Sequence, residues 1–389
     1  MTDIDTIKIL NNLISYPTVS RDANINLINY IASLISCENV KPVIIKNKEK
    51  SKANLFASIG PKNNEGVMLS GHTDVVPIDG QDWTKPPFEC TYENGLYYGR
   101  GTADMKGFVA CAVNAFIKAK QLKLANPLYL ALSYDEEIGC LGVRSLIDMM
   151  EDLKYKPSMC IVGEPTSMSI ATGHKGKTAL KAECVGVEAH SALAPTGTNA
   201  IHLACDLINE IRIMQKEIAE KGYKDNDYDI TYTTLHVGKI SGGIVLNIVP
   251  NHTSVDFEIR NLVQDDPSII LEKLKVRIAL IIKAARKTAP SADIKITIAN
   301  EYPGLNTDIN SEIVSFISSL TGSNNTIKVA FGTEGGLFSS KLSIPTIVCG
   351  PGSMNQGHKP DEFVSEEQLI NCDRMLETLI YRLQKGIQN

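Results

Sequence analysis

The 389-residue sequence lacks any run of about 18 apolar residues, the length that a membrane helix needs. Its start also lacks the basic head and apolar stretch of a signal peptide. We therefore expect a cytoplasmic protein that is neither exported nor embedded in a membrane. Lys and Arg are scattered and the formal net charge is -5. Because binding to a phosphate backbone needs clustered positive charge, we do not expect a nucleic acid partner.

The nine cysteines include no C-x-x-C pair. Most lie inside apolar runs, such as Cys160 between Met159 and Ile161, which is typical of buried, reduced thiols. This pattern argues against a disulfide framework and against a cysteine-bound metal. The sequence has no internal repeat and no low-complexity tract.

The order of the predicted elements indicates two domains. Short apolar runs alternate with helical patterns in the first and last parts of the chain, which predicts an α/β sheet. In the middle the order becomes strand, helix, strand, strand, helix, strand, a split βαββαβ unit. We therefore expect one discontinuous domain from 1–176 and 301–389, with an α+β domain at 177–300 inserted into it. The predicted buried strands are 67–70, 128–134, 159–162 and 346–349, and the predicted helices are 104–121, 200–221 and 267–285. Further strands are predicted at 177–187, 231–240, 253–260 and 293–298.

Acidic and imidazole side chains follow the four buried strands. His72 and Asp74 follow the first, Glu136 and Glu137 the second, Glu164 the third, and His358 ends the loop after the fourth. Asp104 closes a glycine-containing loop and opens a predicted helix. The crevice of an open α/β sheet lies beyond the carboxyl ends of its strands, so these side chains should converge. Two imidazoles with several carboxylates suit Zn, Co or Mn, and the set is large enough for two ions that share a carboxylate.

Each of these residues also has an ordinary structural explanation. Asp104 could cap its helix, Glu164 could begin a turn before Pro165, and the two adjacent glutamates could lie on a solvated turn. A coincidence at four strand ends is much rarer than one at a single strand, so the pattern as a whole favours a metal site.

At these positions the chain resembles the dinuclear aminoacylase and carboxypeptidase family of metallopeptidases. The resemblance spans nearly the whole chain and is specific as a combination, although each segment alone is weak. It implies a mixed, mostly parallel sheet flanked by helices, of the zinc-peptidase type, with a ferredoxin-like insert that forms a homodimer. The segments are SGHTDVVP (70–77), GRGTADMKG (99–107), SYDEEIGCLG (133–142), VGEPT (162–166), HKGKTAL (174–180), EAHSALAP (188–195), LNIVPN (246–251), FEIRN (257–261), FGTEGG (331–336) and GHKPDEF (357–363).

The resemblance also implies a role for each position. His72, Asp104 and Glu164 would bind one metal ion, and Asp104 would bridge to a second ion held by Glu137 and His358. Asp74 would orient the imidazole of His72, and Glu136 would be the general base. The peptide bond Asp104-Met105 would be cis. From the inserted domain, His190 would stabilise the oxyanion in the partner subunit's site. Arg260 would pair with the substrate α-carboxylate, Asn247 would bond near the scissile group, and Glu334 would bind a substrate ammonium.

These roles imply hydrolysis of the amide of an N-acylated amino acid with two divalent ions, Zn²⁺ foremost and Co²⁺ or Mn²⁺ as alternatives. The segments FGTEGG and SYDEEIGCLG favour N-acetylornithine, cut to ornithine and acetate in arginine biosynthesis. The alternative is a succinyl-diaminopimelate desuccinylase, or another N-acyl-amino-acid amidohydrolase or dipeptidase, in which Glu334 does not contact substrate. A metal-dependent binding protein without catalysis is a third reading, and the presence of Glu136 argues against it.

Overall fold

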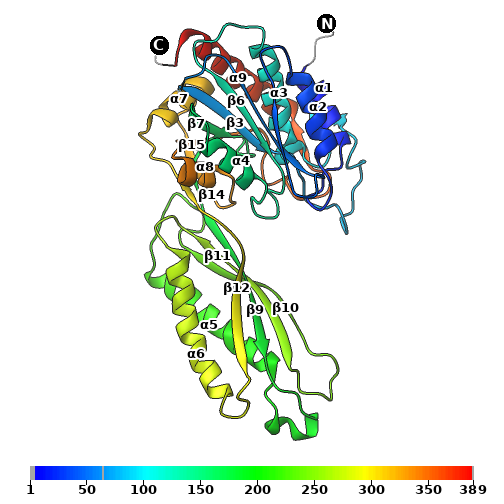
Figure 1. Ribbon diagram of the computed structural model, residues 1–389, viewed down its shortest axis with the longest axis vertical. Helices are drawn as coiled ribbons and strands as arrows, with labels where there is room; N and C mark the ends of the chain where they lie inside the picture. Colours follow the sequence, from blue (N-terminus) through cyan, green and yellow to red (C-terminus); the bar gives the residue numbers. More distant parts are fainter. Residues whose placement is uncertain (1–4, 64, 388–389) are drawn as a thin grey trace. The chain divides into compact units, whose positions relative to one another are not determined.

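The computed structural model describes residues 5–63 and 65–387, which form two compact units (Figure 1). The first unit takes in the chain up to Gly173, Leu305–Lys328 and the chain from Thr333 onward. The second comprises His174–Gly304 and Val329–Gly332. These bounds differ at both ends from the expected insert, 177–300. Among the described residues, none of the helices combines the length and the apolar content of a membrane span.

The first unit is built on a nine-stranded sheet whose centre is parallel. β3 (Gly66–His72) pairs in parallel with β6 (Leu128–Ser133) and with β7 (Pro157–Val162), and β15 (Thr346–Val348) continues the parallel order beside β7. Every residue of β3 and β6 is buried, as their continuous apolar sequences predict. The outer strands are β1 (Val43–Lys46), β2 (Ala53–Ile59), β8 (Ile170–His174), β13 (Leu305–Asn306) and β14 (Thr326–Val329). A separate small sheet joins β4 (Thr91–Glu93), β5 (Leu96–Tyr98) and β16 (Phe363–Ser365).

Helices pack on the large sheet in two groups, which confirms the predicted mixed α/β fold. The first group is centred on α3 (Gly107–Ala119), which contacts β3 and β6 as well as its neighbouring helices. This group also contains α1 (Thr6–Ser15), α2 (Ile25–Ile35), α9 (Glu366–Lys385) and, against α9, α7 (Glu312–Thr321). The second group contains α4 (Val143–Glu151) and α8 (Gly335–Leu342).

The predicted helix start at Asp104 is wrong. A short turn, η1 (Thr102–Lys106), intervenes, and α3 begins at Gly107. Asp104 has φ -122° and ψ 94°, outside the helical region, so it does not cap α3. The Asp104-Met105 peptide bond is cis, as predicted.

The second unit has the predicted βαββαβ order and forms an antiparallel sheet, which confirms the ferredoxin-like insert. Its strands pair in the order β10 (Thr234–Gly242), β11 (His252–Asn261), β9 (Gly176–Val185), β12 (Asp293–Tyr302). The helices α5 (Ala200–Lys221) and α6 (Pro267–Ala285) have the predicted bounds. The side chains of Asn199 and Asp266 cap them, and these caps are readable in the sequence. A short 3₁₀ turn, η2 (Ser191–Thr196), follows β9.

Candidate metal centre

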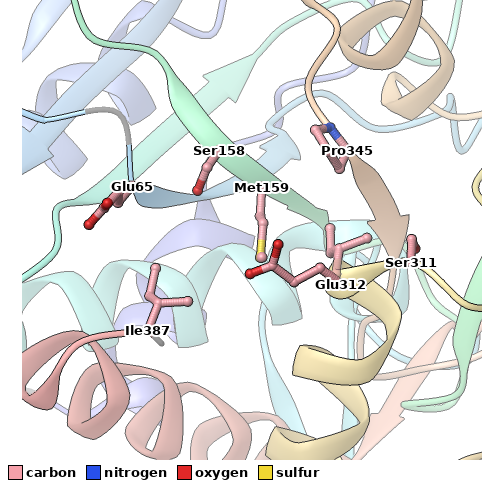
Figure 2. Close-up of a pocket in the computed structure, with 8 residues that line it drawn as sticks. Glu65, Ser158, Met159, Ser311, Glu312, Pro345 and Ile387 are labelled. Carbon is pink, nitrogen blue, oxygen red and sulfur yellow. The ribbon is translucent and has the colours of Figure 1, made fainter. Parts of the chain in front are cut away.

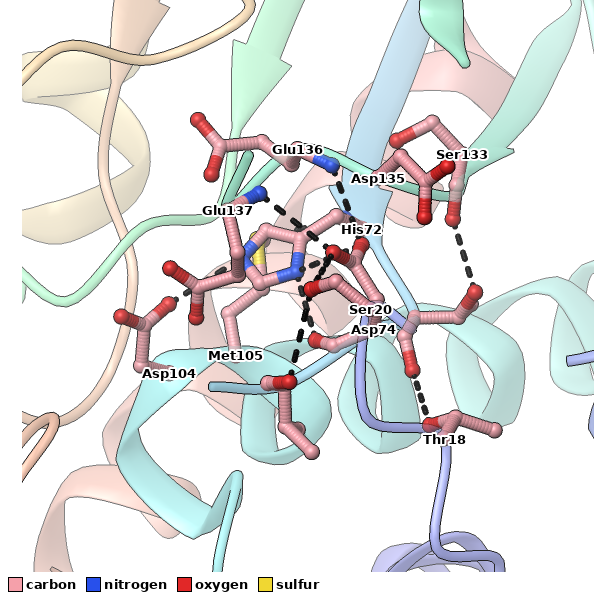
Figure 3. Close-up of polar contacts among 12 residues, drawn as sticks. Thr18, Ser20, His72, Asp74, Asp104, Met105, Ser133, Asp135, Glu136 and Glu137 are labelled. Atoms are coloured by element: carbon pink, nitrogen blue, oxygen red, sulfur yellow. Dashed lines mark hydrogen bonds and ion pairs between the residues drawn. The ribbon is translucent and has the colours of Figure 1, made fainter. Parts of the chain in front are cut away.

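The predicted ligands of the first unit lie at the carboxyl ends of the parallel strands. Figure 3 shows three of them, His72, Asp104 and Glu137. His72 is the last residue of β3, Glu136 and Glu137 follow β6, and Glu164 follows β7. Asp104 comes from η1, and His358 comes from the loop after β15. Two elements and three loops therefore bring together residues that are as much as 286 positions apart, from His72 to His358.

The carboxylate of Asp104 lies between the two imidazoles. Its Oδ1 is 3.0 Å from Nε2 of His72, and its Oδ2 is 3.1 Å from Nε2 of His358. On the His72 side, Glu164 Oε1 lies 3.7 Å from the same Nε2. On the other side, Glu137 Oε2 lies 3.0 Å from Nε2 of His358. The donor atoms thus form two clusters that share one carboxylate.

The imidazole of His72 is fixed through its other nitrogen. Nδ1 lies 2.9 Å from the backbone oxygen of Asp74 and 3.5 Å from the Asp74 carboxylate. A proton on Nδ1 bonded to the backbone carbonyl leaves Nε2 with a free lone pair, which is the form a metal ligand needs.

The Asp74 carboxylate makes contacts that its sequence position alone did not predict. It accepts hydrogen bonds from the backbone N–H groups of Glu136 and Glu137, at 3.2 and 3.3 Å, and from Ser20 Oγ at 2.7 Å (Figure 3). Asp74 therefore fixes the turn that carries the two glutamates. Nothing in the sequence around Ser20 signals its contribution.

The charge in this cluster favours a bound cation. Burial raises the pKa of Glu164 well above its usual value and that of Glu137 to about 7, and the Asp104 carboxylate adds to both. Hydrogen bonds to Asp104 and Glu137 raise the pKa of His358 to about 10. Burial alone would lower the pKa of His72, but bonds to Asp104 and Asp74 raise it well above its usual value. These crowded carboxylates are the ligand type of hard and borderline divalent ions.

Within the described residues, two triplets of side chains have ligand atoms within 4.8 Å of one another: His72 with Glu136 and Glu164, and His72 with Asp104 and Glu137. Both triplets contain His72 and neither contains His358, so they divide the side chains differently from the two clusters around Asp104. By distance alone, Glu136 lies near enough to act either as a ligand or as a base. Burial raises its pKa well above the usual value; His72 opposes this shift, and Glu137 and Glu334 add to it.

Glu334 lies in the same unit, at the N-cap position of α8, and only 1% of it is exposed. Ser133, the last residue of β6, donates a hydrogen bond to its Oε1. Burial raises its pKa to about 7, partly offset by the bond from Ser133. The predicted substrate partner is therefore a buried carboxylate beside the end of β6.

The other predicted site residues belong to the second unit, where His190 and Asn247 lie side by side. Antiparallel pairing continues past the ends of β9 and β11: His190 pairs with Ile248, and the backbone N–H of Ser191 donates to Asn247 O at 3.0 Å. Both predicted side chains are exposed.

Arg260 lies at the opposite end of β11 from that pair. Its Nε donates to Glu258 at 3.0 Å and its Nη1 to the hydroxyl of Tyr302 at 3.1 Å, so the orientation of the guanidinium is fixed. Arg260 lies eight positions along the strand from His252, where β11 begins. At about 3.3 Å per residue this is about 26 Å, and His190 and Asn247 lie beyond that beginning.

A separate pocket lies at the other end of the parallel strands (Figure 2). Glu65 precedes β3, Ser158 is the second residue of β7, and Pro345 precedes β15. These three residues lie at the amino ends of the parallel strands, and the predicted ligands lie at the opposite, carboxyl ends. The pocket is thus not part of the candidate metal centre.

Comparison with known proteins shows that the chain is similar to hydrolases. The profile of the peptidase family M20/M25/M40 matches residues 68–382. An acetylornithine deacetylase of Buchnera aphidicola subsp. Acyrthosiphon pisum (strain APS) is 29% identical over 380 residues, covering 96% of this chain and 97% of the relative. An acetylornithine deacetylase of Pasteurella multocida (strain Pm70) is 32% identical over 381 residues, with the same two coverages, 96% and 97%.

Solved structures show the same fold. An M20 family metallo-carboxypeptidase from Sulfolobus solfataricus superposes with a TM-score of 0.76 at 20% identity, over 98% of this chain and 99% of that one. A Bacillus subtilis protein described as a dinuclear metal binding peptidase superposes with a TM-score of 0.69 at 14% identity, over 98% of both chains.

Proposed function

This chain belongs to the peptidase family M20/M25/M40 and is a hydrolase that acts on amides, and from this premise we propose that it cleaves N-acetylornithine to ornithine and acetate. The full-length relatives named acetylornithine deacetylase support this substrate. In a cell the reaction would belong to arginine biosynthesis.

We assign two divalent ions, Zn²⁺ foremost and Co²⁺ or Mn²⁺ as alternatives, to the two donor clusters around Asp104. His72, Glu164 and one oxygen of Asp104 would hold the first ion; Glu137, His358 and the other oxygen would hold the second. When bound, such ions lower the pKa of water and polarise an acyl carbonyl. The sharing of the two Asp104 oxygens between two imidazoles is the observation that carries the proposal.

Glu136 is the proposed general base. It accepts the proton of the attacking water and then delivers it to the amine nitrogen as the amide C–N bond breaks. Its backbone is held by the Asp74 carboxylate, and burial keeps its pKa above the usual range for a glutamate. A carboxylate whose pKa is raised by burial is a stronger base, which suits both halves of this proton transfer.

Two residues are proposed to select the substrate. Arg260 would hold the α-carboxylate with its guanidinium, which Glu258 and Tyr302 orient. Glu334 would pair with the δ-ammonium of ornithine. Burial of its carboxylate disfavours the lone negative charge, so a cationic group beside it would be stabilised.

The length of β11 supports a shared active site. A substrate as small as N-acetylornithine cannot contact Arg260 and the His190–Asn247 pair of one chain when about 26 Å of strand lies between them. We therefore propose a homodimer through the second unit, in which His190 and Asn247 of one protomer complete the site of its partner. His190 would donate to the oxyanion of the tetrahedral state.

Release of the free amino acid from a substrate panel tests the proposed reaction. We expect the metal-loaded protein to cleave N-acetylornithine with a higher kcat/KM than N-succinyl-diaminopimelate, N-acetylmethionine or a dipeptide. In Glu334→Gln, kcat/KM for N-acetylornithine should fall by about 10-fold or more, while that for N-acetylmethionine changes little, because a charged pair is lost only with the first substrate.

Two results would redirect the assignment. Preference for the succinylated substrate would show the desuccinylase alternative to be right, and equal losses on both acetylated substrates would remove Glu334 from substrate recognition. Absence of any amide cleavage would favour a metal-dependent binding protein.

A further inference from the structure

Glu362, a residue outside the predicted site, holds the backbone on which Asp104 sits. Its Oε1 accepts hydrogen bonds from the N–H groups of Ala103 and Asp104, both at 3.0 Å. Its Oε2 accepts from Nη1 of Arg100 at 2.6 Å. Glu362 and Arg100 are each 1% exposed. A buried ion pair in general contributes little net stability. We therefore interpret the Arg100–Glu362 pair as a support that fixes the backbone of η1.

Arg100 extends this contact to Gln81. Nη2 of Arg100 and Nε1 of Trp83 both donate to Gln81 Oε1, at 2.5 and 3.1 Å. Two donors on one side of the amide identify that atom as the oxygen, so the opposite side must be the NH₂ group. That group donates to the backbone oxygen of His358 at 2.8 Å.

The backbone at His358 needs such support. His358 has φ +63°, in the left-handed region that side-chain-bearing residues seldom adopt. The next carbonyl, that of Lys359, accepts a hydrogen bond from Arg100 Nη1 at 3.3 Å. The side chain of His358 is 45% exposed, so packing alone holds it loosely.

We propose that Arg100, Glu362 and Gln81 form a positioning network that places Asp104 and His358 at the correct separation for the second metal ion. The inference rests on the proposed two-ion function. Glu362 contacts the backbone of the shared ligand Asp104, whereas Gln81 contacts the backbone of His358 directly and reaches Asp104 only through Arg100 and Glu362. Loss of the hydrogen bond from Gln81 to His358 should therefore weaken binding of the second ion and leave binding of the first ion nearly unchanged. Hydrogen bonds behind metal ligands typically change metal affinity by about 10–100-fold.

Metal binding by Gln81→Met tests the network without reference to turnover. Methionine has a similar length and cannot donate to the carbonyl of His358. The full-length protein, stripped with a chelator, is titrated with Zn²⁺ against a chromophoric competitor to give two dissociation constants. We expect one of the two binding steps to lose about 10–100-fold in affinity and the other to stay within about 2-fold of the unsubstituted protein.

Thr84→Val is the matched control. Thr84 lies in the same loop but bonds to Asp361, through both its backbone N–H and its hydroxyl. Its substitution should leave both constants unchanged. Unchanged constants in Gln81→Met, or an equal loss at both steps with a lower thermal midpoint, would overturn the positioning role. Fewer than two ions bound by the unsubstituted protein would overturn the proposed two-ion function itself.

Discussion

In the proposed mechanism, Asp104 binds metal and Glu136 transfers protons. Asp104 faces one imidazole with each oxygen, at 3.0 and 3.1 Å, which suits a bridging ligand. The surroundings of Glu136 are different: Cys140 Sγ lies 3.4 Å from its Oε1. Its neighbour Glu137 contacts His358 directly. Two adjacent glutamates therefore have different surroundings, and substitution should separate their roles.

For Glu136→Gln we expect intact metal content and a turnover lower by about 10²–10⁴-fold, because the amide cannot accept the proton of water. Glu137→Gln is the matched comparison, and it should bind one metal ion less firmly. Metal analysis and initial rates on N-acetylornithine measure both effects. Turnover near that of the unsubstituted protein in Glu136→Gln would remove this residue from the mechanism.

At this scale the sequence predicted the side chains that follow buried strands but not their supports. His72, Glu137 and Glu164 come directly after apolar runs, a pattern visible in one dimension. Ser20 and Gln81 act on Asp74 and on the backbone of His358, which are 54 and 277 residues away. Such contacts depend on the folded path of the chain. Arg100 and Glu362 lie inside the segments GRGTADMKG and GHKPDEF that resemble the family. These segments mark the two residues as candidates but do not indicate that they contact each other.

At the scale of elements, the ends of the strands determine where the predicted site residues lie, and the length of β11 determines how far apart two groups of them are. The parallel arrangement of β6, β3 and β7 brings the predicted ligands at their carboxyl ends to one edge of the sheet. In the second unit, the length of β11 separates Arg260 from the His190–Asn247 pair. A site that uses both needs two chains, and this arrangement makes the activity of mixed dimers informative.

We expect two inactive variants, Glu136→Ala and His190→Ala, to complement each other. In a mixed dimer, the subunit that carries His190→Ala keeps its own Glu136 and receives His190 from its partner. Random reassortment makes half of the dimers mixed with one competent site each, so about a quarter of the activity should return.

Co-expression of the two variants and rate measurements on the purified mixture provide the test. His190→Ala alone should lose about 10²–10³-fold, as for a missing oxyanion donor. No recovery despite demonstrated subunit exchange would mean that His190 acts within its own chain.

The bounds of the two long helices of the second unit could be predicted, and the errors at other predicted elements have local causes. The helices α5 and α6 were placed correctly because Asn199 and Asp266 mark their starts. The strand predicted to end at Ile298 continues to Tyr302, because a bulge between Ile298 and Asn300 breaks the alternation of apolar and polar residues. The predicted start of α3 is too early because Asp104 and Met105, in the turn η1 just before the helix, have a non-helical backbone.

At the scale of the whole molecule, the two units carry complementary parts of the proposed reaction. The first unit holds the donor clusters and Glu136, and the second holds Arg260, His190 and Asn247. The sequence order indicated this division, since an α/β pattern resumes after the insert. Dimer formation leaves no comparable mark in one dimension, and it stays a prediction that rests on the family resemblance and on the length of β11.

The central claim is that two metal ions in the clusters around Asp104 enable hydrolysis of N-acetylornithine. Its most direct test is to strip the full-length protein of metal, titrate it with Zn²⁺ and follow acetate release from N-acetylornithine at each loading. We predict negligible release from the stripped protein and a rise that levels off at two ions per chain. Activity that is complete without added metal, or no acetate release at any loading, would contradict this account.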